Sequence, residues 1–402
     1  MIRTFEVHGN EYEMGFQIGC VFQQFLKDAI PKYERMLADP GLRSTVREVA
    51  AKLEVQYPRL LMEMNGRADG AGIPRDPAYL MFFTELHTPR NGCTTAILKK
   101  KNGHVLFCHN DDELTYHADN VALIKYNYGN FWIVSYTVAD TLAGSAFSWN
   151  SAGMVFTSNF ILTGKTDFSS ISRFVMERDI INSRSMDEAK DKLLNCEVAS
   201  PFSMSILECQ SETVLNAEKD LKDLYITPIS DRFARSNHFL AKPGPVPEPP
   251  AETLFRYQRT KELLAGLNAE TADIADLIRI LGDQSEYYNT SVFKDTDFYQ
   301  RLNRCNMKSL EDIGFSLTGK HETVRIYDCS GNCLSEFGKM EILQSLFKVA
   351  TVANFAFDSE SRHIRIADYL GHDVLSIDYE GFMGNPAEKI ISDTPSAIPS
   401  KT

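Results

Sequence analysis

The sequence lacks a long hydrophobic run, an excess of basic residues and any internal repeat. No apolar stretch approaches the roughly 18 residues that a membrane-spanning helix needs, so we expect no membrane association. The net charge is −12, and no stripe of lysine and arginine would attract a nucleic acid. The opening stretch has no apolar core of the signal-peptide kind, and we therefore expect a cytoplasmic protein.

Cysteine is present but sparse. Eight cysteines are scattered over 402 residues, a spacing that does not suggest a disulfide framework. The one close pair, Cys329 and Cys333, lies on a predicted turn and has no second pair or histidine at metal-ligand spacing. We therefore expect neither structural disulfides nor a cofactor.

Residues 1–92 are predicted to be mainly helical after a short strand, Ile2–Val7. Apolar residues recur at helical spacing in 17–38 and 46–66, and Pro31 is expected to break or kink the first of these helices. The segment 77–85 is apolar nearly all round and should be buried. This part of the chain therefore resembles a helical layer that packs on something else.

From Cys93 onward the pattern changes to antiparallel strands separated by short turns. Helices are predicted at 171–183 and 186–195, and again at 252–267 and 271–281 after a proline-rich surface loop. Further strands are predicted at 94–98, 104–109, 121–126, 131–138, 145–149, 154–160, 204–209, 212–217, 224–226, 349–357 and 363–367. The order indicates an α+β fold in one domain, with sheets between helical layers.

The pair Asn102-Gly103 predicts a hairpin, because Asn-Gly between strand-like runs favours a two-residue type I′ turn. That turn would place Cys93 opposite Asp112, with Cβ atoms about 4.5–5.5 Å apart. Asp111 would point to the other face, because side chains alternate along a strand. The spacing therefore predicts one particular carboxylate beside one particular thiol.

Cys93 has no obvious base nearby, but the peptide bond before it offers one. Cleavage between Gly92 and Cys93 would give Cys93 its own α-amine, with an ordinary pKa of about 7.7–8.0, which can accept the thiol proton. Glycine before the cysteine tolerates the unusual backbone geometry that attack on its own carbonyl would need. The alternative interpretation is that Cys93 is a small buried hydrophobic residue in a strand.

Two other sites are conceivable. A metal site could use His109, Asp111, Asp112, Glu113 and His117, but the predicted register puts His109 and Asp111 on one face and Asp112 on the other, so we expect no metal. A papain-like pair of Cys93 with His238 or His363 has no local sequence signature to support it.

Several motifs, in order along most of the chain, are familiar. The chain resembles the acyl-coenzyme A:isopenicillin-N acyltransferase family, which includes hydrolases of β-alanyl amines. The matching stretches are Gly9–Gly19, Glu63 with 68–72, Glu85, Gly92–Thr95, 109–112, Trp149–Met154 and 236–239.

The resemblance implies an N-terminal-nucleophile fold, a four-layer αββα sandwich made as an inactive precursor. Residues 1–92 would become the α chain and 93–402 the β chain, and the two would stay associated. Family roles carry over to Cys93 as nucleophile and base, Asp112 as supporting carboxylate and Asn237 as oxyanion-hole amide.

Three further assignments follow from the same resemblance. Arg304 is the best match to an arginine that the family has late in the chain, although the stretch after it is longer here. Asn150 and Thr94 are candidates for substrate binding, and the Asn-Ser-Ala-Gly context of Asn150 also suits a simple turn residue.

The expected function is that of a self-processing cysteine amidohydrolase or acyltransferase acting on a small N-acyl amine or amino-acid derivative. Its partners would be a small-molecule amide, an acyl-coenzyme A donor where acyl transfer occurs, and the two fragments of its own chain. A homo-oligomer remains open. The alternative is an unprocessed, catalytically silent protein of the same fold that binds a small molecule.

Overall fold

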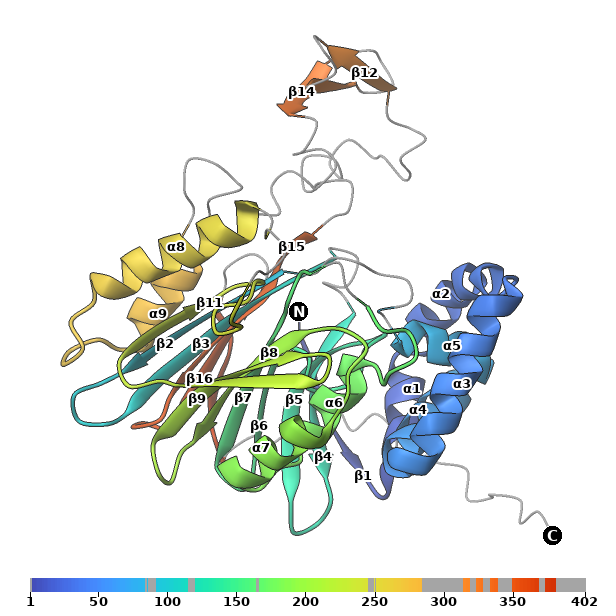
Figure 1. Cartoon of the computed structure of the whole chain (residues 1–402), viewed down its shortest axis with the longest axis horizontal. Helices are drawn as coiled ribbons and strands as arrows, with labels where there is room; N and C mark the ends of the chain where they lie inside the picture. Colours follow the sequence, from blue (N-terminus) through green and yellow to red (C-terminus); the bar gives the residue numbers. More distant parts are fainter. Residues whose placement is uncertain are drawn as a thin grey trace.

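The computed structural model describes most of the chain. The described residues are 2–83, 85, 92–114, 120–163, 166–244, 249, 251–283, 314–318, 323–327, 333–338, 349–368 and 373–380. Figure 1 shows two large sheets side by side, with helices on both outer sides.

A short strand and five helices form the N-terminal part of the chain. They are β1 (Arg3–His8), α1 (Glu11–Val21), α2 (Gln23–Met36), α3 (Pro40–Gln56), α4 (Pro58–Ala71) and α5 (Arg75–Phe82). A capping box between Asn10 and Glu13 starts α1, satisfying backbone N–H groups that a helix start leaves free. The buried apolar segment predicted at 77–85 is confirmed for 77–83, whereas Glu85 is partly exposed and residue 84 lies outside the described residues.

Two predicted helix boundaries are wrong. The helix expected over 17–38 is two helices that meet at Phe22, and the second runs through Pro31 without ending there. The helix expected over 46–66 is also two, because α3 ends at Gln56, Tyr57 separates the helices and Pro58 begins α4. Proline suits a first helical position, where its missing N–H costs nothing.

The larger sheet has eight strands in the order β1-β4-β5-β6-β7-β8-β9-β10. Its strand β1 pairs with β4 in parallel, so the N-terminal segment contributes an edge strand to a sheet otherwise built from later residues. Helices α6 (Arg173–Ile180) and α7 (Met186–Asn195) follow β7. The remaining strands are β4 (Val121–Asn127), β5 (Trp132–Val138), β6 (Phe147–Asn150), β7 (Met154–Phe160), β8 (Phe202–Glu208), β9 (Thr213–Asp220) and β10 (Asp223–Pro228).

The second sheet has six strands in the order β11-β2-β3-β15-β16-β17, and β2 and β3 lie inside it. Helices α8 (Ala251–Ala265) and α9 (Ile274–Leu281) accompany this sheet. Its strands are β2 (Gly92–Lys99), β3 (Val105–Leu114), β11 (Arg232–Arg235), β15 (Val349–Asp358), β16 (His363–Asp368) and β17 (Asp373–Asp378). Three short strands, β12 (Gly314–Thr318), β13 (Thr323–Tyr327) and β14 (Cys333–Gly338), form a separate small sheet.

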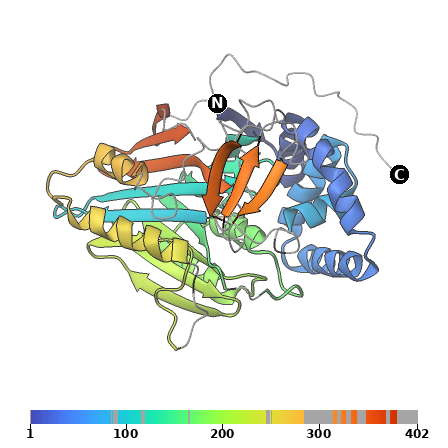
Figure 2. The ribbon, with the colours of Figure 1, turned by 90° about the horizontal axis from the view of Figure 1, so that it is seen from above.

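Three apolar clusters define the layers. One lies between the two sheets and includes Ile97, Phe107, Trp149 and Phe355. A second joins the larger sheet to α1–α7, and the third joins the smaller sheet to α8 and α9. Figure 2 shows α8 and α1–α5 at opposite ends of this stack. The predicted α+β fold, a four-layer αββα sandwich, is confirmed.

No helix in the described part of the chain is both long enough and apolar enough to cross a bilayer.

Helices α1 and α4 cross at contact distance through glycines. A Cβ added to Gly15 would lie 2.1 Å from the carbonyl oxygen of Glu63, and one added to Gly66 would lie 2.1 Å from that of Tyr12. A Cβ added to Gly19 or Gly70 would likewise lie 2.3 Å or 2.1 Å from a carbonyl oxygen of the other helix. The two backbones can therefore pack this tightly only while these positions lack side chains.

The hairpin register differs from the predicted one by a single residue. Lys99 pairs with Val105 and Cys93 with Asp111, so Asp112 pairs with Gly92 instead of Cys93. The turn has three residues: Gly103 N–H donates to the Lys100 carbonyl, and Gly103 has a φ of 97°. A type I turn followed by a left-handed glycine is the common three-residue hairpin, and it shifts every facing pair by one.

Candidate active site

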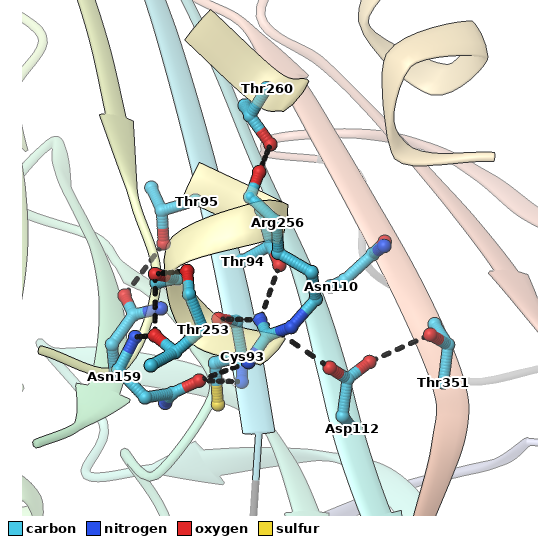
Figure 3. Close-up of polar contacts among 12 residues, drawn as sticks. Cys93, Thr94, Thr95, Asn110, Asp112, Asn159, Thr253, Arg256, Thr260 and Thr351 are labelled. Carbon is cyan, nitrogen blue, oxygen red and sulfur yellow. Dashed lines mark hydrogen bonds and ion pairs between the residues drawn. The ribbon is translucent and has the colours of Figure 1, made fainter. Parts of the chain in front are cut away.

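Cys93 lies near the start of β2, and its backbone is held on both sides. Its N–H donates to Asn237 Oδ1 at 3.0 Å, and its carbonyl oxygen accepts from Arg256 Nη1 at 2.7 Å. The residue is 4% exposed. Asn237 therefore holds the peptide unit at the predicted cleavage point, and Arg256 holds the peptide unit that follows it (Figure 3).

Arg256, on α8, is the centre of the polar contacts on the helix-facing side of the hairpin. Besides the Cys93 carbonyl, its guanidinium donates to Thr94 Oγ1 at 2.8 Å and to Asn237 Oδ1 at 2.7 Å. It also lies 3.7 Å from Asp112 Oδ2. Figure 3 shows the Arg256 side chain between Cys93 and Asp112. Arg256 and Asp112 are both buried, so this charge pair is largely shielded from water.

Asp112 reaches the site through Arg256 and not by facing the thiol. Its Oδ1 accepts a hydrogen bond from Thr351 Oγ1 at 2.6 Å, which links β3 to β15. Because Asp112 lies opposite Gly92 in the ladder, it remains beside the Gly92–Cys93 bond. The predicted pairing of Asp112 with the Cys93 side chain is wrong, whereas its proximity to the cleavage point is retained.

Asn237 is fixed at both ends of its amide. Its Oδ1 accepts from Cys93 and Arg256, and its Nδ2 donates to the Phe160 carbonyl at 2.8 Å. Its backbone N–H donates to Thr253 Oγ1 at 2.8 Å. In this arrangement the side chain positions the amide of Cys93, and its donor group is engaged by a backbone carbonyl. The predicted oxyanion-hole role remains a prediction.

A second group of polar side chains lies on the other face of the hairpin, toward the larger sheet. Cys93, His109 and Asp111 each offer a ligand atom, and these atoms lie within 4.8 Å of one another. His109 and Asp111 share a face, as predicted, and the one-residue shift in register puts Cys93 on that same face in place of the predicted opposite one. His117 lies outside the described residues.

His109 belongs to a buried hydrogen-bonded chain. Its Nδ1 lies 2.9 Å from Thr95 Oγ1, and that hydroxyl donates to Asn159 Oδ1 at 2.7 Å. The Thr95 hydroxyl donates its only hydrogen to Asn159. In the contact between Thr95 and His109, Nδ1 of the histidine is therefore the protonated donor. The tautomer leaves a lone pair on Nε2, a buried atom with no hydrogen-bond partner among the described residues.

The thiol is buried and lies near several carboxylates. Burial raises the pKa of Cys93 well above its ordinary value, and Asp111, Asp112 and Glu113 raise it further, whereas Arg173 lowers it. Burial also lowers the pKa of His109 to about 3. At neutral pH, therefore, the uncut chain holds a protonated thiol beside a neutral imidazole, and the thiol is a weak nucleophile.

The other predicted site residues have different places. Thr94 is buried and accepts from Arg256, so it supports the arginine and does not line an open site. Asn150 lies in the β6–β7 turn, where its side chain donates to Ile181 and Ser183 and accepts from Ala152 and Met154. These contacts fit the turn role, and the substrate role of Asn150 stays a prediction.

Arg304 lies outside the described residues, and the structure offers no view of it. The papain-like alternative is not supported, because the described hydrogen bonds of His238 go to Ser236 and Thr253 and those of His363 to Asp378 and Ser376. A cavity of about 730 Å³ lies between α1, α4 and α7, and its lining residues include neither Cys93 nor its contacts.

Sequence reasoning missed Arg256, although the pattern of α8 contains a signal for it. Thr253, Arg256, Thr260 and Leu264 recur at helical spacing and are all buried, so the arginine occupies a core-facing position of the helix. A buried arginine requires anionic or carbonyl partners, and such a position could have been flagged as part of a site.

Comparisons with known proteins show the family of the chain. The family model described as acyl-coenzyme A:6-aminopenicillanic acid acyl-transferase matches residues 98–302, just over half of the chain. The β-alanyl-dopamine/carcinine hydrolase of Drosophila melanogaster is 25% identical over 227 residues, which cover 49% of this chain and 58% of that protein. The chain thus spans less than two thirds of the length of this curated relative.

Two solved structures are similar at lower levels. The Caenorhabditis elegans ortholog of N-acylethanolamine-hydrolyzing acid amidase has a TM-score of 0.39 and 13% identity, covering 50% of this chain and 90% of that one. Penicillin V acylase from Agrobacterium tumefaciens has a TM-score of 0.40 and 10% identity, covering 72% and 86%. On the match of the family model, the chain belongs to the acyl-coenzyme A:6-aminopenicillanic acid acyl-transferase family.

Proposed function

We propose that this protein is a self-processing thiol amidohydrolase or acyltransferase in which Cys93 first cuts the Gly92–Cys93 bond and then acts on the amide bond of a small N-acyl amine or amino-acid derivative. The observation that carries the proposal is the clamp on the Cys93 backbone: Asn237 holds its N–H and Arg256 its carbonyl, and Arg256 in turn lies beside Asp112. Two buried polar side chains on the backbone of one residue, with a buried carboxylate beside them, carry a desolvation cost that points to a special task for that residue.

The processing step is an N-to-S acyl shift. The sulfur of Cys93 attacks the carbonyl carbon of Gly92, the C–N bond breaks, and the thiol proton passes to the departing nitrogen. Water then hydrolyses the thioester, leaving a carboxylate on Gly92 and a free amine and thiol on Cys93. The Asn237 contact keeps that nitrogen at a fixed position throughout.

The freed amine changes the state of the thiol. In the uncut chain the pKa of Cys93 is raised by burial and by three nearby carboxylates, so the sulfur keeps its proton. An amine with a pKa of about 7.7–8.0 on the same residue can take that proton, and the resulting ammonium stabilises the thiolate. Cleavage therefore supplies both the base and the counter-charge that the uncut site lacks.

Turnover then follows acyl transfer through a thioester. The thiolate attacks the substrate carbonyl, the ammonium returns its proton to the leaving amine, and the acyl group passes from sulfur to water or to an acceptor amine. The fruit-fly relative, named for β-alanyl-dopamine and carcinine, supports a small β-alanyl or similar acyl amide as substrate. An acyl-coenzyme A thioester is the donor to expect where acyl transfer replaces hydrolysis.

The first test is intact-mass analysis of the purified protein. For the wild-type protein we expect two fragments, one ending at Gly92 and one beginning at Cys93. For Cys93→Ala we expect a single full-length chain. Cys108→Ala is the matched control, because Cys108 is a buried thiol of the same hairpin that faces α8 and α9. An uncut wild-type chain would favour the silent binding protein of the same fold, and cleavage that persists in Cys93→Ala would refute the proposed nucleophile.

The second test is turnover. The cleaved protein is mixed with carcinine, and release of histamine is measured together with any acyl adduct on the fragment that begins at Cys93. We expect a mass increase of one acyl group on that fragment only. Addition of an acyl-coenzyme A and an amine then distinguishes transfer from hydrolysis by the product formed.

A further inference from the structure

The group formed by Cys93, His109 and Asp111 has the composition of a transition-metal site. A thiolate, an imidazole and a carboxylate are the three side-chain ligands that Zn²⁺ uses in proteins. All three residues are buried, and their ligand atoms already lie within 4.8 Å of one another. Atoms bound to one tetrahedral zinc ion lie about 3.5 Å apart, so the group has to close by little more than about 1 Å.

His109 is prepared as a ligand. Its Nδ1–H is tied to Thr95, which is itself fixed by Asn159, and its Nε2 is buried with a lone pair that no described residue uses. Metal-bound histidines in proteins typically donate their second ring N–H in this way, because the contact fixes both the tautomer and the ring orientation. Without such a ligand, a buried ring nitrogen that lacks a hydrogen-bond partner would only lower the stability of the fold.

The charge around the group also favours a cation. Asp111, Asp112 and Glu113 act on the Cys93 sulfur as negative charges, and Arg173 acts as a positive one. On the opposite face of the hairpin, Arg256 offsets Asp112. A divalent cation bound at the sulfur would be attracted by these carboxylates.

We propose that Cys93, His109 and Asp111 bind a thiophilic divalent cation, Zn²⁺ being the best match, and that the bound ion reversibly blocks the nucleophile. Binding forms one Zn–S, one Zn–N and one Zn–O bond, and the thiol proton leaves to solvent. A fourth position stays open to water. The block of activity rests on the proposed function of Cys93, whereas the binding itself does not.

The test uses full-length protein stripped with a chelator and then mixed with Zn²⁺ or Co²⁺. We expect one tightly held ion per chain and, with Co²⁺, the near-ultraviolet charge-transfer absorption of a cobalt–thiolate bond. His109→Ala and Asp111→Asn should weaken Zn²⁺ binding by more than about 100-fold, the upper range for loss of an outer partner. Cys108→Ala and Cys20→Ala remove a buried and an exposed thiol outside the group and should bind as the wild type does.

The test does not depend on the folding of every variant. Cys93→Ser replaces only the sulfur atom, and the cobalt spectrum is measured on the wild-type protein. Absence of the cobalt–thiolate absorption, or Zn²⁺ binding that survives in Cys93→Ser, would overturn the site. Stoichiometric binding in a chain that shows no self-cleavage would support the metal site and count against the proposed enzyme. Self-cleavage with no metal binding would do the reverse.

Discussion

Replacement of Arg256 by alanine should destabilise the protein far more than a similar change nearby. The substitution removes the guanidinium from the Cys93 carbonyl, from Thr94 and from Asn237, and takes a buried cation away from the carboxylate of Asp112. Loss of one partner of a buried charged pair costs about 3–5 kcal/mol. Two charges about 4 Å apart at an effective dielectric constant of 20 attract by about 4 kcal/mol, which is of the same size.

The matched control lies one turn further along α8. Arg259 pairs with Asp283 at 2.7 Å, but its side chain is 39% exposed, and exposed pairs contribute about 0–1 kcal/mol. Urea unfolding of the wild type, Arg256→Ala and Arg259→Ala gives the three free energies directly, by linear extrapolation. Equal losses for the two variants would refute the argument that Arg256 is the organising contact.

A charge-conserving variant keeps the test decisive if Arg256→Ala does not fold. Arg256→Lys retains the positive charge beside Asp112 but cannot donate to Cys93, Thr94 and Asn237 together, because it lacks the planar fork of donors. We expect it to fold, to lose less free energy of unfolding than Arg256→Ala, and to cleave itself more slowly, as followed on a denaturing gel over time. Unchanged cleavage would show that the fork does not position Cys93.

Three further predictions follow from other parts of the chain. Gly66→Ala should destabilise the protein by about 1–3 kcal/mol or more, because its Cβ would lie 2.1 Å from the Tyr12 carbonyl oxygen, whereas Gly266→Ala meets nothing closer than 3.4 Å and should be neutral in thermal melts. Burial raises the pKa of Glu177 to about 7, against the opposing effect of Arg173. The folded state then binds more protons than the unfolded state between pH 4.5 and about 7, so this group's contribution to stability falls as pH rises through that window, and Glu177→Gln should flatten the fall in pH-dependent unfolding. Burial, Arg235 and Arg256 lower the pKa of His238 to about 4, so its contribution to stability is lost as pH falls from about 6.5 toward 4, and His238→Gln should reduce that loss in the same experiment.

Much of the fold could be predicted because its signals are local. The strands from Val121 to Phe160 and the helices α6 and α7 follow from alternation, helical spacing and turn residues, and the structure confirms them. The breaks at Phe22 and Tyr57 were missed because the apolar pattern continues across them, and only packing decides where one helix ends and the next begins.

The site was harder to predict because it depends on register and on distant segments. Asn102-Gly103 indicates a hairpin correctly, but two- and three-residue loops both accept Gly103, and the choice between them moves Asp111 to the thiol face. Arg256 lies 163 residues from Cys93 in sequence, and no periodicity within α8 reveals which strand the arginine will meet. A site built from side chains of different layers is therefore easier to identify in the structure than in the sequence.

Strand β1 gives the proposed cut an unusual consequence. Because Arg3–His8 is hydrogen-bonded along its whole length to β4, and α1 and α4 pack on the same larger sheet, the first 92 residues share a hydrophobic core with the residues after the cut. Severing the bond at Gly92 would free a nucleophile without freeing a fragment. The product would behave as one protein with an additional C-terminus and an additional N-terminus. Only denaturation would separate it into two chains.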